Sequence, residues 1–89
     1  MSNVSMPSSS DLKQSVIDSI KANGGRATNA EILAWTIKSL SLVQTQLEVM
    51  RAGNRSEIEY RLAWARTRAS KEGLIHRSGP STWSLGTNK

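Results

Sequence analysis

Basic side chains gather in one stretch of this sequence. Seven of the 12 lysine and arginine residues lie between Arg51 and Arg77, where only three acidic residues accompany them. Up to Met50, basic and acidic residues balance. A cluster of guanidinium and ammonium groups attracts phosphates and other anionic groups. The formal net charge of +5 therefore predicts a polyanionic partner, with a solvated helix face carrying internal ion pairs as the alternative.

The candidate binding residues in and around this stretch are basic, hydroxyl-bearing or aromatic. Arg66, Lys71 and Arg77 are the main candidates for contacts with phosphates, and Tyr60 is a candidate for stacking on a base or sugar. The full set of candidates is Arg55, Tyr60, Arg66, Thr67, Arg68, Ser70, Lys71, Arg77 and Ser81.

Catalytic and metal chemistry have little support in the residue types. There is no cysteine, so the sequence has neither a disulfide nor a thiolate metal site. The single histidine, His76, is expected to be a surface residue. No nucleophile, base and orienting group are spaced for catalysis. We expect a protein that is not an enzyme and that has no cofactor and no small-molecule substrate.

The terminal residues and the hydropathy of the chain predict where in the cell the protein is found. No apolar run approaches the roughly 20 residues that a membrane span needs. The start MSNVSMPSSS lacks the charged and apolar regions of a signal peptide, and we expect residues 1–10 to be a disordered lead-in. We expect one soluble, cytoplasmic domain over residues 11–86, followed by a tail at 87–89.

Helical spacing predicts the elements of the first half. Residues 11–23 form an expected helix with one apolar face, and Gly24-Gly25 ends it. Thr28 and Glu31 have capping-box spacing and begin a second helix. Its predicted inner stripe is Ala30, Leu33, Ile37 and Leu40, widened by Ile32 and Trp35. A third, shorter helix is expected over 43–51.

The second half predicts a long helix followed by a hairpin. The helix covers about residues 56–72, with Ser56 and Glu59, or Asn54 and Glu57, as its cap. Its inner face is Ile58, Leu62, Ala65 and Ala69. Two short strands are expected at 74–77 and 82–85, with Trp83 and Leu85 on one half-buried face.

This order of elements is that of a winged helix, a mainly α fold with a small β-hairpin. The helix at 56–72 is then the recognition helix and the hairpin at 74–85 is the wing. Small side chains such as Ala63, Thr67 and Ser70 suit entry into the DNA major groove, about 12 Å wide. Flanking arginines and lysines suit the phosphates. The expected partner is double-stranded DNA.

Several residues of the second half also resemble a known family. The run Tyr60-Arg61-Leu62-Ala63-Trp64-Ala65, the step Gly73-Leu74-Ile75 and the strand Trp83-Ser84-Leu85 are similar to the N-terminal domain of Mrr-type restriction endonucleases. The resemblance covers about residues 11–85. It implies a winged helix and DNA binding in proteins that act on modified foreign DNA. The wing turn, Ser78 to Ser81, lacks the Arg-Gly pair of the family, and the nuclease carboxylates have no counterpart.

Other interpretations stay open from the sequence alone. Many winged helices dock on proteins, and Glu57, Glu59 and Glu72 among the arginines allow that alternative. RNA binding is a third option, weaker because Tyr60 alone is no stacking platform. Trp64 is expected to be a core residue, as are Trp35 and Trp83, and Arg61 is left between a helix-end hydrogen bond and a DNA contact. The oligomeric state is not readable.

Overall fold

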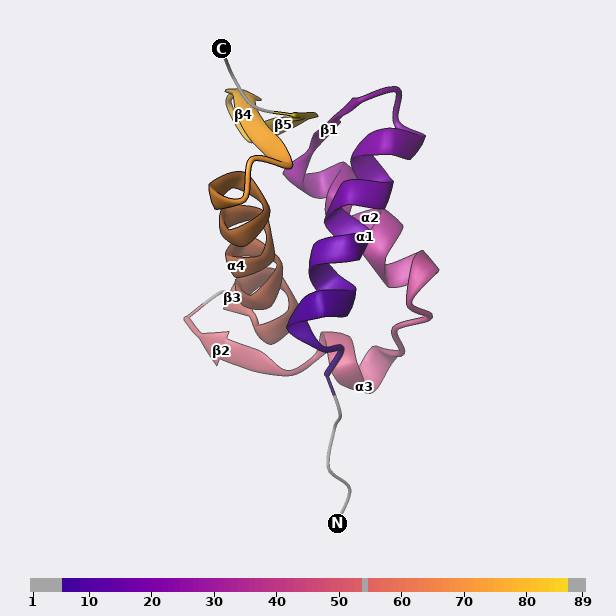
Figure 1. Ribbon diagram of the computed structural model, residues 1–89. Helices are drawn as coiled ribbons and strands as arrows, with labels where there is room; N and C mark the ends of the chain where they lie inside the picture. The colour runs from indigo at the N-terminus through magenta and orange to yellow at the C-terminus, as the bar shows by residue number, and fades with distance from the viewer. Residues whose placement is uncertain (1–5, 54, 87–89) are drawn as a thin grey trace.

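The computed structural model describes residues 6–53 and 55–86. In this described part the helices are α1 (Ser9–Ala22), α2 (Asn29–Ser39), α3 (Gln44–Leu47) and α4 (Glu57–Lys71). The strands are β1 (Arg26–Thr28), β2 (Met50–Ala52), β3 (Arg55–Ser56), β4 (Ile75–Gly79) and β5 (Thr82–Leu85). Figure 1 shows α1 and α2 on one side of the molecule and α4 on the other, with β4 and β5 beside one end of α4 and β2 and β3 beside its other end.

Helix α1 begins two residues earlier than the sequence pattern predicts. The Ser8 side chain accepts a hydrogen bond of 3.1 Å from the Asp11 backbone N–H and so caps the helix at Ser9. The predicted glycine stop is confirmed, since the Gly25 N–H donates to the Ile20 carbonyl at 2.8 Å. Of the predicted lead-in and tail, residues 1–5 and 87–89 lie outside the described residues.

Helix α2 has the predicted cap and most of the predicted inner face, with a buried threonine that the apolar pattern did not predict. Thr28 and Glu31 form the capping box, with hydrogen bonds of 3.1 and 2.8 Å. The buried residues are Ile32 and Thr36, whereas Ala30 is exposed. Thr36 shares a buried hydrogen bond of 2.7 Å with Ser15 of α1, and this bond satisfies both hydroxyls. Of the predicted stripe, Ile32 is buried and Leu33, Ile37 and Leu40 pack against the core, whereas Ala30 and Trp35 are exposed, and the buried polar residue Thr36 was not predicted.

The predicted third helix is confirmed over α3, but its last residues belong to strand β2 of a hairpin. Helix α3 ends at Leu47, and β2 pairs antiparallel with β3, Met50 opposite Ser56. Gly53, at φ +57°, permits the tight turn between them. A further backbone hydrogen bond of 2.8 Å, from the Glu57 N–H to the Val49 carbonyl, joins the segment before β2 to the start of α4. The alternative cap residue Asn54 lies outside the described residues.

Helix α4 confirms its predicted cap, core face and end. Ser56 and Glu59 form the capping box. The predicted inner residues Ile58, Leu62, Ala65 and Ala69 are all at most 2% exposed. The chain leaves the helix through Gly73, at φ +77°, with a hydrogen bond of 2.9 Å from the Leu74 N–H to the Ala69 carbonyl.

The last two strands form the predicted hairpin, and β1 joins it. The sheet order is β1-β5-β4, antiparallel throughout, with Ala27 opposite Trp83 and Arg77 opposite Trp83 on the other side. Trp83 packs against the core and donates its indole N–H to Asn29 at 2.9 Å, while Leu85 is 37% exposed. Only Trp83 of the predicted strand face is therefore a core contact.

One apolar cluster joins the helices and the sheet. Its buried members come from α1, β1, α2, α4, β4 and the segment after α2, namely Leu12, Val16, Ile20, Ala27, Ile32, Leu42, Ile58, Leu62, Ala65, Ala69 and Ile75. Helices α1, α2 and α4 with the short α3, a hairpin after α4 and a third strand between α1 and α2 make this a winged helix, as the order of elements predicts.

Candidate nucleic-acid interface

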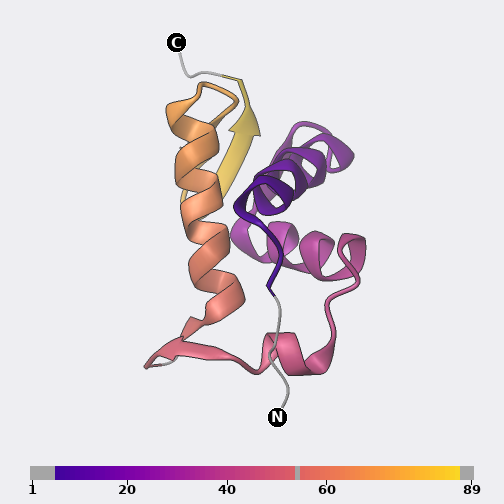
Figure 2. The same cartoon turned by 60° about the horizontal axis from the view of Figure 1, so that its bottom comes forward.

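The candidate interface follows α4 and the two hairpins at its ends. Figure 2 shows α4 as a straight helix with β2 and β3 at its N-terminal end and the β4–β5 hairpin beside its C-terminal half. The core occupies one side of this helix, so the opposite side and its flanks are the parts that face solvent.

The structure places the predicted site residues on these three elements. Six of them are exposed: Arg55, Thr67, Arg68, Lys71, Arg77 and Ser81. The other three, Tyr60, Arg66 and Ser70, are half-buried. They lie on different sides of α4, because Arg55, Tyr60 and Thr67 line one shallow depression while Arg68 lines another, against α1.

The three glutamates of the basic stretch each form intramolecular hydrogen bonds or ion pairs. Glu57 accepts a hydrogen bond of 2.6 Å from Arg61 Nε, Glu59 belongs to the helix cap, and Glu72 forms an ion pair of 2.7 Å with Lys13. Among the residues that the structure describes, the basic candidates form no ion pair; these are Arg55, Arg66, Arg68, Lys71 and Arg77. Internal ion pairs therefore do not account for the basic excess.

A groove between α2 and α4 brings two of these arginines together. Its volume is about 560 Å³. The lining residues are Asn29, Ala30, Leu33, Arg55, Glu59, Leu62 and Arg66. Glu59 also lines this groove, and its carboxylate accepts hydrogen bonds of 3.1 Å from both the backbone N–H and the hydroxyl of Ser56.

Arg66 is a partly buried cation whose side chain is not fully hydrogen-bonded. Its Cζ lies 5.9 Å from the centroid of the Trp83 ring, and its buried Nε has no hydrogen-bond partner. Burial, and then the charge of Arg55, lowers the pKa of the Arg66 guanidinium. An orphaned buried donor is rare in folded proteins. An anion in the groove would offset the repulsion between Arg66 and Arg55, which both line it.

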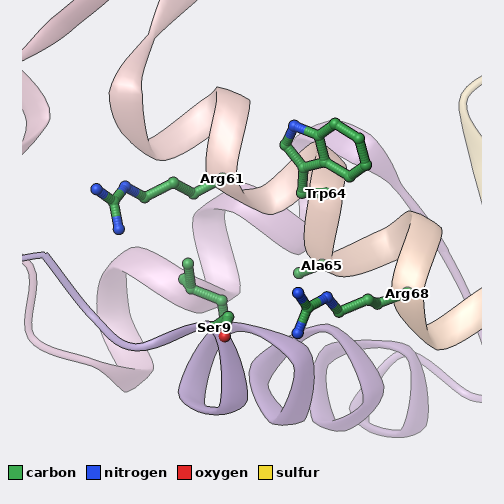
Figure 3. Close-up of a pocket in the computed structure, with 6 residues that line it drawn as sticks. Ser9, Arg61, Trp64, Ala65 and Arg68 are labelled. Carbon is green, nitrogen blue, oxygen red and sulfur yellow. The ribbon is translucent and has the colours of Figure 1, made fainter.

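Two of the three tryptophans are exposed, although all three were predicted to be core residues. Trp64 is 55% exposed and Trp35 is 37% exposed, so neither is a core residue. Figure 3 shows the Trp64 ring projecting away from α1, above a depression of about 130 Å³ that Arg61 and Arg68 also line. Trp64 falls outside the inner stripe of α4, and that spacing was the available signal for its exposure.

Arg51 was not among the sequence candidates, and the sequence did not decide for Arg61 between a helix-end hydrogen bond and a DNA contact. Arg51 lies on β2, with its Cζ 4.1 Å from the centroid of the Tyr60 ring and its Nη1 3.6 Å from Glu57 Oε1. Arg61 bonds Glu57 one turn back in its own helix, rather than the end of a neighbouring helix. The stacking of Arg51 depends on the β2–β3 hairpin, which the sequence pattern did not predict.

The wing hairpin is tied to the rest of the fold near its turn. The Ser81 carbonyl accepts a hydrogen bond of 2.8 Å from the Asn29 N–H at the start of α2. Arg77 is exposed on β4, and His76 Nδ1 donates to the Gly86 carbonyl at 2.8 Å. The hydrogen bond gives His76 a structural contact, and it is half-buried rather than a free surface residue.

Two negative findings concern only the part of the chain that the structure describes. Residues 6–53 and 55–86 contain no group of three or more histidine, aspartate or glutamate side chains placed to hold a metal ion. Within the same residues, no helix has the length and apolar content needed to cross a membrane.

Comparison with known proteins gives one match. The profile of the family described as the Mrr N-terminal domain matches residues 10–88, nearly the whole chain. No curated protein and no solved structure matches. The matched range includes α4, the glycine step after it and the closing strand β5. The chain therefore belongs to the Mrr N-terminal domain family.

Proposed function

We propose that this domain binds double-stranded DNA, with α4 as the recognition helix and the β4–β5 hairpin as the wing. The observation that carries the proposal is the set of basic side chains on α4, β3 and β4 that form no ion pair among the described residues. Membership of a family of N-terminal domains of restriction proteins supports the same function.

In this arrangement the exposed side of α4 enters the major groove. Ala63 and Thr67 are small enough to let the helix approach the base edges, and Thr67 already donates its hydroxyl to the Ala63 carbonyl at 3.0 Å. Arg55 precedes the N-terminal end of α4 and Lys71 is its last residue, so the two lie at opposite ends of the helix. Both would contact phosphates. Arg66 would donate to a phosphate in the groove between α2 and α4.

The first experiment follows the anisotropy of a labelled random duplex of about 20 base pairs at several salt concentrations. Each phosphate contact releases counterions, so the logarithm of the binding constant should fall with the logarithm of salt, by about one unit of slope per contact. Arg55→Gln and Lys71→Gln should each weaken binding several-fold at low salt and reduce the slope by about one.

Lys38→Gln is the matched control for these variants. Lys38 is an exposed lysine in the last turn of α2, outside the proposed surface, and its replacement removes the same charge. It should leave the salt slope unchanged. Equal losses in all three variants would indicate an unspecific charge effect, and no binding even at low salt would refute the proposal.

Docking on another protein is the second candidate function. It is supported by exposed apolar side chains, of which Trp64, Val43 and Met50 are each more than half exposed. Tryptophan, tyrosine and arginine are also the residues most often found at the centres of protein interfaces. If the titration shows no DNA binding at low salt, protein docking becomes the favoured function.

A further inference from the structure

Two aromatic rings lie next to each other on the solvent side of α4. Tyr60 and Trp64 are one turn apart, their ring centroids are 6.5 Å apart and their planes meet at 73°. Trp64 keeps 55% of its surface exposed. The indole N–H of Trp64 has no hydrogen-bond partner among residues 6–53 and 55–86. The two rings therefore give this side of α4 a large and mostly apolar exposed surface.

The β2–β3 hairpin and the start of α4 hold this pair in place. The Arg51 guanidinium stacks on the Tyr60 ring with its Cζ 4.1 Å from the centroid. Glu57, only 9% exposed, attracts Arg51 at 3.6 Å and is itself bonded to Arg61 at 2.6 Å. Tyr60 therefore has a contact on one face and the edge of Trp64 nearby, so its position is fixed from two sides.

Trp64 also stands between two basic parts of the surface. The depression on one side of it is lined by Arg55, Tyr60 and Thr67, and the depression on the other side by Arg61 and Arg68. If α4 lies in a major groove, arginines on both sides are near the two phosphate strands, and Trp64 is directed at the base edges between them.

We propose that Trp64 contacts the C5-methyl groups of thymine in the major groove, with Tyr60 and Arg51 as positioning residues. The inference rests on the proposed binding of DNA by α4. Base edges in the major groove present hydrogen-bond donors, acceptors and one apolar group, which is the thymine methyl. An exposed indole ring gains most from that group, because burying the methyl and the ring surface together removes apolar area from water.

The geometry favours a methyl contact over the stacking of an unpaired base. Proteins that bind single strands stack bases on accessible aromatic faces. Here one face of Tyr60 is covered by Arg51, and the Trp64 ring meets Tyr60 at a steep angle, so the two rings do not enclose a base between parallel planes.

The test compares thymine with uracil, which lacks only the methyl group. A pool of random duplexes is first enriched on the wild-type protein, and the enriched pool is then amplified with either dTTP or dUTP. Competition at low salt, where phosphate contacts sustain binding, measures the preference. We expect the thymine pool to bind about four-fold more tightly for each methyl contacted, the ratio that corresponds to about 0.8 kcal/mol.

The variants separate a methyl contact from a structural effect. Trp64→Ala should bind both pools equally, with an unchanged salt slope and unchanged circular dichroism, and Trp64→Phe should keep part of the preference. Trp35→Ala, at the other exposed tryptophan, should keep all of it.

Three results would overturn the inference. The first is wild-type binding that depends on salt but does not distinguish the pools, which leaves DNA binding intact. The second is a preference that persists in Trp64→Ala, and the third is tighter binding of single strands than of duplex. Absence of DNA binding at low salt would instead refute the proposed function, and the thymine contact with it.

Discussion

Glu57 is the residue that links the β2–β3 hairpin to the start of α4. Its carboxylate accepts a hydrogen bond from Arg61 Nε at 2.6 Å and lies 3.6 Å from Arg51 Nη1. The hydrogen bond from Arg61 is the largest cause that lowers the pKa of the Glu57 carboxyl below its ordinary value of 4.5, and the charges of Arg61 and Arg51 add to it. An acidic residue in the first turn is thus also the partner of two arginines of the candidate interface.

The lowered pKa of Glu57 predicts a loss of stability in acid. A carboxyl whose folded pKa is depressed stabilises the fold above its ordinary pKa of 4.5, and that contribution is lost as the pH falls through the folded pKa. Glu57→Gln should therefore unfold at lower urea than wild type at neutral pH, and the difference should shrink in acid below the folded pKa. Urea titrations of both proteins across this range would measure it. A difference that stays constant with pH would show that the ion pairs contribute nothing.

At the scale of elements, α2 shows how a buried polar pair sets the rotation of a helix. The hydroxyls of Ser15 and Thr36 share a hydrogen bond of 2.7 Å, and both residues are at most 3% exposed. The predicted inner face included Ile32, Leu33 and Ile37, which do contact the core, but it did not include Thr36. Apolar periodicity alone cannot reveal such a partner, because it lies 21 residues away in the sequence.

This pair gives a prediction about the free energy of unfolding. Thr36→Val keeps the shape of the side chain but leaves the Ser15 hydroxyl without its partner, so it should cost about 1–3 kcal/mol. The double variant Ser15→Ala, Thr36→Val removes both polar groups and should recover most of that loss. Urea unfolding followed by circular dichroism would give both values. A double variant as unstable as the single one would mean that packing, and not the hydrogen bond, sets the cost.

At the scale of the whole molecule, a single core holds the recognition helix, the wing and the first helix in one unit. Leu62 of α4, Ile20 of α1 and Ile75 of β4 are each at most 1% exposed within the same cluster. The pairing of β1 with β5 joins the wing to the segment between α1 and α2. The position of the wing beside α4 is therefore a property of the core and not of a flexible hinge.

We expect this unit to unfold in one cooperative step. Leu62→Ala removes buried methyl groups and should lower the free energy of unfolding by about 2–5 kcal/mol, a large part of the stability of a small domain. Leu74→Ala, at a position 41% exposed, is the matched control and should cost much less. Circular dichroism and tryptophan fluorescence should report the same urea midpoint. Separate midpoints would show that the wing unfolds independently.

The sequence by itself determined the features that rest on short-range interactions. The capping boxes at Thr28 and Ser56, the glycine stops and the inner face of α4 each depend on residues within a few positions of one another. These local signals predicted the order of helices and hairpin, and with it the winged helix. The basic excess after Met50 is likewise a matter of composition, and it predicted a polyanionic partner for the second half of the chain.

Only the tertiary structure decided the features that depend on distant partners. The β2–β3 hairpin forms through pairing across a turn, and it places Arg51 on Tyr60. The position of the Arg66 guanidinium over the Trp83 ring depends on strand β5, which follows α4 in the chain. Contacts of this kind arise when segments pack together, so the candidate interface, and not the fold, is where sequence and structure differ most.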